Sequence, residues 1–143
     1  MEFTEIKYPN IIELNSIGSP ELGYITVGEQ LKDVPFEIKR TYWTYFTPHN
    51  VKRGQHAHRQ LDQLIVSVCG SLKMELETID GKTFEFILDT PNKGLLLHSY
   101  TWRKMTFSHN AVLLCLASEL YRESDYIREY SEFEILKSKF NAK

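Results

Sequence analysis

The sequence predicts an all-β protein: a barrel or sandwich of antiparallel strands with short C-terminal helices, in a single domain of residues 1–143. Short β-forming stretches recur from residue 35 to residue 118 with turn residues between them, which is the spacing of a sandwich or barrel. Asp80-Gly81 separates two of these stretches and has the turn chemistry of a tight hairpin. Apolar residues take helical spacings only near the end of the chain.

The predicted strands share short length, β-branched or aromatic residues, and turn residues at their ends. They span residues 35–46, 63–69, 72–79, 82–88, 95–98, 102–107 and 111–118. Residues 64–69 and 112–117 are apolar at nearly every position, whereas a strand with one wet face alternates. We therefore expect both to be covered on two faces, by the second sheet and by a further cover such as a dimer partner.

The segment 121–140 predicts one or two short helices that close the domain against the sheet. Its apolar residues at helical spacings are Tyr126, Ile127, Tyr130, Phe133 and Leu136. Ser131 is followed three residues later by Glu134, which is the pattern of a helix capping box.

Composition and charge argue against a nucleic-acid or membrane partner and indicate the compartment of the protein. The formal net charge is −2 and the basic residues are scattered, so no basic stripe indicates a nucleic-acid partner. No run approaches the roughly 18 apolar residues of a membrane helix, and Glu2, Glu5 and Lys7 are unlike a signal peptide. Cys69 and Cys115 lie in apolar runs without metal-binding spacing, which predicts two buried thiols. We expect a cytoplasmic protein with neither a membrane nor a nucleic acid as partner.

One face of the 35–46 stretch breaks its own pattern. Its even-numbered residues are Phe36, Ile38, Arg40, Tyr42, Thr44 and Phe46. An arginine on an apolar face is unusual, because burying an unpaired charge is costly. Either this is an edge strand whose Arg40 reaches water, or the face lines a polar cavity with Arg40 and Tyr42 pointing into it.

His56 and His58 share a face of an extended chain, because they are two residues apart. Two solvated histidines near a turn would show the same pattern. The surrounding spacing resembles the first motif of the cupin superfamily, with His56, His58, position 63 and Gly70 at the expected places. This resemblance implies a small jelly-roll barrel with a site inside it.

The residues at two further cupin positions argue against a metal. Metal-binding cupins use both histidines, an acidic residue and a later histidine. Here the acidic position is Gln63, and the later histidine position is Arg103, whose positive charge repels a divalent ion. We therefore predict no metal and no other cofactor, which leaves the two histidines free for proton transfer.

Several segments together resemble a narrower family, the dTDP-4-oxo-6-deoxy-D-glucose 3,4-ketoisomerases of bacterial surface-sugar synthesis. They are "PFEIKRTYW", "RGQHAHRQLDQ", "GSLKMEL", "GLLLHSYTWRKM" and "LASELYRESDYIREYSEF". The resemblance implies an isomerase that moves the keto group of dTDP-4-keto-6-deoxyglucose from carbon 4 to carbon 3 through an enediol. The product would feed dTDP-linked 3-amino-3,6-dideoxy sugars of surface polysaccharides such as O-antigen or S-layer glycan. Members resemble tight homodimers with exchanged N-terminal strands.

The resemblance also implies catalytic roles. His56, the first histidine of "HAH", is the expected base, and an imidazole with a pKa of about 6.5 is largely neutral at cellular pH. His58 and Tyr42 are the expected partners, which orient His56, carry a second proton or bind a sugar oxygen.

Five further residues are expected to bind the substrate. Arg40 and Arg53 would neutralise the diphosphate or the developing oxyanion. Trp102 would stack on the thymine ring, with a core tryptophan as the alternative. Arg103 would face the sugar, and Gln63 would hydrogen-bond His58 or be a satisfied core amide.

Two other functions stay open on the sequence. One is a metal-dependent cupin enzyme such as a dioxygenase, and the other is a non-catalytic module that binds sugar nucleotides. Metal content distinguishes the first from an isomerase, and turnover of the keto sugar distinguishes the second.

Overall fold

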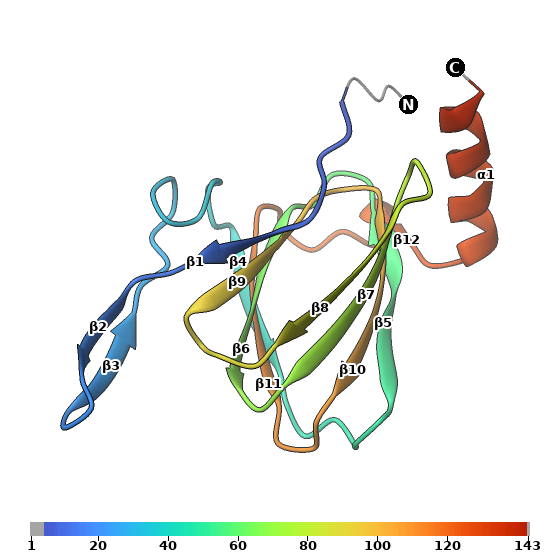
Figure 1. Ribbon diagram of the computed structural model, residues 1–143. Coiled ribbons are helices and arrows are strands. Elements are labelled where there is room, and N and C mark those ends of the chain that lie inside the picture. The colour runs from blue at the N-terminus through green and yellow to red at the C-terminus, as the bar shows by residue number, and fades with distance from the viewer. Residues whose placement is uncertain (1–4, 143) are drawn as a thin grey trace.

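Two five-stranded antiparallel sheets form the body of the protein, in a computed structural model that describes residues 5–142 (Figure 1). The first sheet has the order β1 (Asn10–Glu13), β9 (Lys93–Leu97), β6 (Gln63–Cys69), β11 (Val112–Ala117), β4 (Arg40–Thr44). The second has the order β12 (Tyr126–Ile127), β5 (Lys52–His58), β10 (Thr101–Phe107), β7 (Leu72–Thr78), β8 (Thr83–Leu88). The all-β prediction is confirmed, and so is the tight turn at Asp80-Gly81 between β7 and β8.

The core lies between the two sheets and follows from alternation along the strands. In β7, Leu72, Met74 and Leu76 are buried, whereas Lys73 between them is exposed. They pack in one cluster with residues of the first sheet such as Ile65. Each such side chain, when fully buried, contributes about 1.5–3 kcal/mol.

The outer face of the first sheet is covered by the chain segment that precedes β4. Leu64 and Leu96 on that face pack with Val34, which is fully buried, and with Phe36 and Ile38. The outer face of β6 is therefore covered as expected, by a segment of the same chain.

The end of β6 differs from the prediction. Strand β9 pairs with β6 only from Gln63 to Val66, so the strand loses one neighbour beyond that point. Val68 and Cys69 are exposed there. The prediction of a buried thiol is right for Cys115 and wrong for Cys69.

The predicted strand 35–46 is too long. Strand β4 spans only Arg40–Thr44 at the edge of the first sheet. Phe36 belongs to the outer cluster and Tyr42 packs against the inner core, because the chain crosses from outside the sheet before it enters β4. Phe46 lies beyond the strand with φ of +59° and is largely exposed, so the even-numbered residues do not form one face.

After β11 the chain forms a 3-10 turn, η1 (Glu123–Asp125), then β12, and then the helix α1 (Tyr130–Asn141). Phe133 of α1 is fully buried in a cluster with Ala57, Trp102 and Ile127. The helix begins after Glu129, so Ser131 lies inside it and the predicted capping box is wrong. Within residues 5–142, neither helical segment has the length and apolar character needed to cross a membrane.

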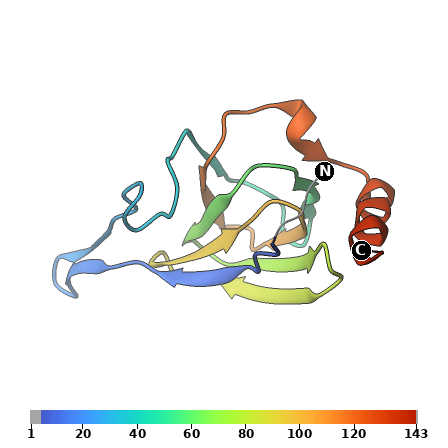
Figure 2. The same ribbon diagram turned by 90° about the horizontal axis from the view of Figure 1, so that it is seen from above.

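A two-stranded arm, β2 (Ser16–Ser19) and β3 (Gly23–Thr26), projects from the side of the two sheets (Figures 1 and 2). Its exposed apolar side chains are Ile17, Leu22, Tyr24 and Ile25. Exposed apolar side chains grouped on one projecting element are typical of a contact surface.

Candidate active site

Strand β5 carries the two histidines and contains a bulge just before them. His56 pairs with Arg103 of β10, whereas Arg53 pairs with Met105, so β5 has one extra residue between the two pairs. Opposed residues of antiparallel strands share a face, so Arg53 and His56 lie on the same side of the sheet. Without the bulge, a separation of three residues would put them on opposite sides.

Gly54 makes this bulge possible. Its φ is +63°, a left-handed conformation that glycine adopts without steric cost. A Cβ at this position would lie 2.2 Å from Cε of Met105. The glycine of the "RG-x-HAH" motif therefore sets which face Arg53 occupies relative to the imidazoles.

The two imidazoles contact each other and an aromatic ring from β12. The ring centroids of His56 and His58 are 4.8 Å apart with an interplanar angle of 90°. Tyr126, which pairs with His58 across β12 and β5, has its ring 5.1 Å from that of His56 and 4.4 Å from that of His58. The guanidinium of Arg128 lies 4.0 Å from the centre of the Tyr126 ring. The C-terminal segment thus forms one wall of the histidine site.

A buried carboxylate lies against the second imidazole. Oδ2 of Asp125 is 3.0 Å from Nδ1 of His58, and both side chains are almost fully buried. Of the two alternatives for Gln63, the hydrogen bond to His58 is wrong, and the satisfied core amide is what the structure has. Gln63 instead donates from Nε2 to the hydroxyl of Tyr42 at 2.9 Å and to Sγ of Cys115 at 3.2 Å.

Arg103 is buried beside the histidines and is bonded only to neutral groups. It donates from Nη1 to Oε1 of Gln63 and from Nη2 to the carbonyl of Thr101, the latter at 3.2 Å. Within residues 5–142 no carboxylate lies within ion-pair distance of this guanidinium. Its side chain is 1% exposed, so the barrel interior holds a cation without an ion-pair partner.

Burial and this cation keep both histidines neutral. Burial, followed by the charges of Arg103 and Arg128, lowers the pKa of His56 to about 3, although Glu123 opposes the shift. Burial and then Arg103 also lower the pKa of His58. Burial, followed by Cys115, raises the pKa of Tyr42, which therefore keeps its proton. The site presents two neutral bases and a neutral phenol beside a positive charge.

The two other predicted arginines lie at the margin of this site. Arg40, on edge strand β4, is half-buried, with its guanidinium 5.4 Å from the ring centre of Tyr42 and 5.7 Å from that of Tyr121. The edge strand of the first alternative for Arg40 is confirmed, and the polar cavity of the second stays a prediction. Arg53 is exposed on the His56 face.

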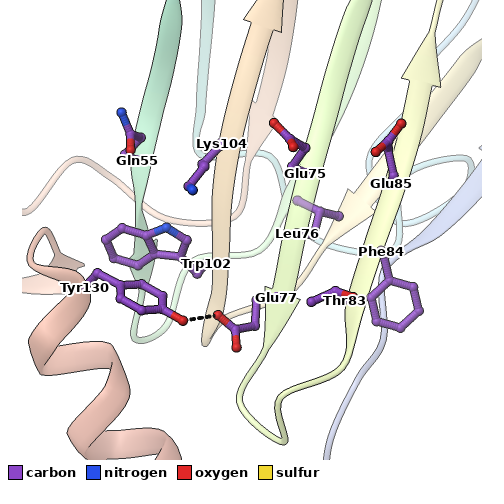
Figure 3. A pocket seen from close by; sticks show the side chains of 10 residues that line it. All are labelled: Gln55, Glu75, Leu76, Glu77, Thr83, Phe84, Glu85, Trp102, Lys104 and Tyr130. Carbon is purple, nitrogen blue, oxygen red and sulfur yellow. Dashed lines mark hydrogen bonds between the residues drawn. The ribbon is translucent and has the colours of Figure 1, made fainter.

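Trp102 lies on the other side of β10 from Arg103, at a groove of about 720 Å³ on the outer face of the second sheet (Figure 3). The residues that line the groove are Gln55, Glu75, Leu76, Glu77, Thr83, Phe84, Glu85, Trp102, Lys104 and Tyr130. Trp102 is 5% exposed and packs against Tyr130 and Phe133 of α1. The structure does not bring Trp102 together with the histidines.

The donor set does not fit a metal. Within the described part of the chain, no group of three or more His, Cys, Asp and Glu side chains is arranged to hold a metal ion. The two cupin ligand positions are filled by the Gln63 amide and the Arg103 guanidinium, which bond each other. Their chemistry suits an anionic or carbonyl oxygen better than a divalent cation.

Sequence reasoning missed Asp125 and Tyr126 as site residues. The segment "SDYIREY" was expected to close the barrel or to make a dimer contact, and its strand β12 pairs with β5 at the edge of the second sheet. The sequence does show an acidic residue, Asp125, next to the aromatic Tyr126. The neighbouring residues do not indicate that Asp125 contacts His58, which is 67 residues away.

A comparison with protein families matches residues 7–138 to the family FdtA, described as WxcM-like, C-terminal. The chain belongs to this family. Its similarity to one relative extends over most of both chains. It is 39% identical over 121 residues to TDP-4-oxo-6-deoxy-alpha-D-glucose-3,4-oxoisomerase of Aneurinibacillus thermoaerophilus, covering 83% of this chain and 86% of that protein.

Solved structures agree with this assignment. The WlaRB TDP-quinovose 3,4-ketoisomerase from Campylobacter jejuni is 39% identical, with a TM-score of 0.82 over 90% of this chain and 98% of that one. A histidine-to-asparagine mutant of the 3,4-ketoisomerase QdtA from Thermoanaerobacterium thermosaccharolyticum, in complex with TDP-4-keto-6-deoxyglucose, is 33% identical. Its TM-score is 0.86 over 95% of this chain and 99% of that one. The FdtA-family chain described here is therefore an enzyme of the 3,4-ketoisomerase kind with a cupin-like fold, as the sequence resemblance implied.

Proposed function

We propose that this enzyme moves the keto group of a TDP-linked 4-keto-6-deoxyglucose from carbon 4 to carbon 3 by histidine-mediated proton transfer. The observation that carries the proposal is a pair of neutral imidazoles beside the buried guanidinium of Arg103, which has no carboxylate partner within residues 5–142. A neutral imidazole accepts a proton, and a positive charge in a dry site stabilises a developing oxyanion. The sugar nucleotide bound to the QdtA mutant supports the substrate assignment.

The reaction needs only proton transfers. His56 takes the proton from carbon 3, the electrons of that C–H bond form the carbon 3–carbon 4 double bond, and the carbon 4 oxygen becomes an oxyanion. The carbon 4 oxyanion then takes up a proton, the hydroxyl on carbon 3 gives up its own proton, and a proton is delivered to carbon 4. Carbon 4 now carries a hydrogen and a hydroxyl, and the ketone is at carbon 3. Atoms and electrons balance without a metal or a redox cofactor.

The remaining predicted residues have roles in this scheme. Arg103 stabilises the enediolate, with Gln63 holding its guanidinium. His58 and Tyr42 are the candidates for the second proton transfer. Arg53, on the His56 face and exposed, is placed for the diphosphate, and Arg40 for the diphosphate or an oxyanion. Thymine stacking on Trp102 stays a prediction, and its position on the outer face of β10 favours the core role named as its alternative.

The product class points to an amino-sugar pathway. A ketone at carbon 3 is the substrate that a 3-aminotransferase requires, so we place the enzyme before such a step in making surface-polysaccharide sugars. A cytoplasmic location and a single domain over residues 1–143 also stay predictions.

We also propose that the protein works as a homodimer in which the N-terminal arms are exchanged. The arm of β2 and β3 contacts the two sheets little and exposes Ile17, Leu22, Tyr24 and Ile25 (Figure 1). Burying these side chains against a second copy would remove that apolar surface from water.

The test is hydrogen exchange at carbon 3. In deuterium oxide, the wild-type protein should exchange that hydrogen of TDP-4-keto-6-deoxyglucose and yield the 3-keto product, read by NMR after trapping with a 3-aminotransferase. His56→Ala should slow exchange by about 10²–10⁴-fold, because it removes the base. The exposed His109→Ala is the matched control and should keep the wild-type rate.

Normal exchange in His56→Ala, with its fold intact by circular dichroism, would remove His56 from the base role. Stoichiometric iron, manganese or nickel with chelator-sensitive activity would favour a metal-dependent cupin. Tight binding of TDP without any turnover of the keto sugar would favour the binding module.

A further inference from the structure

We infer that Asp125 is a positioning residue that holds His58 as the tautomer protonated on Nδ1, so that Nε2 is the ring's hydrogen-bond acceptor. Oδ2 of Asp125 lies 3.0 Å from Nδ1 of His58 in a buried setting. A carboxylate oxygen accepts hydrogen bonds and an imidazole N–H donates them, so this contact fits the tautomer with the proton on Nδ1. Within residues 5–142, no hydrogen bond occupies Nε2.

Asp125 is itself held in place from several directions. Its Oδ1 accepts the backbone N–H of Gln60 at 2.7 Å, and its carbonyl accepts the N–H of Arg59 at 2.9 Å. Arg59 in turn donates from Nη1 to the carbonyl of Tyr126 at 2.6 Å. These bonds tie the 3-10 turn to the end of β5, so the carboxylate has one orientation relative to the histidine strand.

The tautomer matters because each nitrogen of a neutral imidazole has a different task. With the proton on Nδ1, the lone pair of Nε2 is available on the side of the ring away from Asp125. His58 then acts as an acceptor for a proton of the substrate or of His56, whose ring lies 4.8 Å away. With the proton on Nε2, the same ring would be a donor, and one of the two proton acceptors would be lost.

Asp125→Asn should reverse this tautomer. The N–H of Gln60 needs an acceptor at the Oδ1 position, so the amide oxygen stays there and the amide nitrogen faces His58. That nitrogen donates to Nδ1, which moves the imidazole proton to Nε2. The change is nearly isosteric, so the turn should keep its place.

Two measurements test the inference. Long-range proton–nitrogen NMR of wild-type protein with labelled histidine should show His58 protonated on Nδ1, and Asp125→Asn should show it protonated on Nε2. We expect kcat for the keto sugar to fall about 100-fold in the variant, while the Kd for TDP stays within about twofold. A structural role alone would lower stability but would not exchange the two nitrogen signals.

Asp62→Asn is the matched control, because Oδ1 of Asp62 is also close to a histidine nitrogen, Nδ1 of His98 at 3.4 Å, and it accepts the backbone N–H of Ser99. It should leave the His58 signals and kcat unchanged. Wild-type His58 protonated on Nε2, or a wild-type kcat in Asp125→Asn, would overturn the inference. The wild-type spectrum decides it even if the variant does not fold.

This inference rests on the proposed function only for its kcat measurement. If the wild-type protein does not isomerise the keto sugar, the proposed function is wrong, and the NMR measurement still decides the tautomer of His58. A wild-type enzyme that isomerises with His58 in the other tautomer would remove only the role of Asp125.

Discussion

At the residue scale, the chemistry depends on which groups are charged inside the barrel. Desolvation disfavours the charged form of an imidazole, and the adjacent Arg103 disfavours it further, so two causes act in the same direction on His56. Burial lowers the pKa of Arg103, but the ordinary pKa of a guanidinium is so high that the group keeps its proton at neutral pH. The site therefore holds the positive charge of Arg103 beside two neutral imidazoles, those of His56 and His58.

This arrangement predicts that stability falls with acid. The unfolded chain takes up a proton on His56 near pH 6.5, whereas the folded protein keeps it neutral down to about pH 3. The unfolded state binds more protons in this window, so the free energy of unfolding falls as pH decreases from 6.5. His56 should contribute up to about 1.4 kcal/mol per pH unit, measured by urea denaturation between pH 7.5 and 4.5.

His56→Gln removes that titration, so its stability should depend less steeply on pH than that of the wild type. His109→Gln, at an exposed position, should keep the wild-type slope. Parallel curves for His56→Gln and wild type would contradict the prediction.

At the element scale, the bulge in β5 decides which residues share the site. One extra residue at Gly54 brings Arg53 to the face of His56, and the partner strand β10 presents Arg103 to that face and Trp102 to the other. Alternation along a strand predicts faces correctly only while the register is regular. A prediction from two-residue alternation therefore cannot detect the extra residue that brings Arg53 to the His56 face.

Gly54→Ala tests the bulge. Alanine at φ of +63° costs about 1–2 kcal/mol, and its Cβ would also lie 2.2 Å from Cε of the core residue Met105. We expect a loss of about 1–2 kcal/mol in the free energy of unfolding from the backbone conformation. We also expect a lower kcat/KM, because the flexible end of Met105 must move aside next to His56, whose Cε1 lies 3.8 Å from the added Cβ.

Gly23→Ala is the matched control for Gly54→Ala. Gly23 also has a positive φ, of +83°, but a Cβ there meets nothing within 4 Å. It should show only the conformational cost and keep normal kcat/KM. Equal losses of stability and activity in the two variants would show that the contact with Met105 does not matter.

At the scale of the whole molecule, the two sheets bury their own core, whereas the arm of β2 and β3 does not. Its projection beyond the sheets leaves Leu22 91% exposed and Ile25 66% exposed (Figure 2). An apolar arm of this kind is stabilised when it packs against another surface. A second copy of the chain is the partner that the family resemblance names.

The dimer proposal predicts a change of mass on mutation of the arm. Wild-type protein should have the mass of two chains by light scattering after size-exclusion chromatography. Ile17→Asp with Ile25→Asp should give one chain at the same concentration, because two charges would have to be buried at the contact. Ile135→Asp on α1, at a similarly exposed isoleucine, should remain a dimer. A monomeric wild-type protein would end the proposal.

The sequence by itself determined the local features of this protein. The alternation in β7, the turn at Asp80-Gly81, the shared face of His56 and His58, and the residues at the two absent ligand positions all follow from neighbouring residues. Local sterics and periodicity fix such features before the strands are paired. These features were enough to predict an all-β fold.

Only the tertiary structure decided what faces each of these groups. Asp125 contacts His58, which is 67 residues away in the sequence. Gln63 hydrogen-bonds Arg103 and Tyr42, and not His58. Cys69 is exposed because the pairing of β9 with β6 ends at Val66. The tertiary structure also put Trp102 under α1, on the face away from the histidines. The reason is physical: periodicity states which face of its own strand a residue occupies, but neighbours are set by strand pairing, bulges and the segments that cover each sheet.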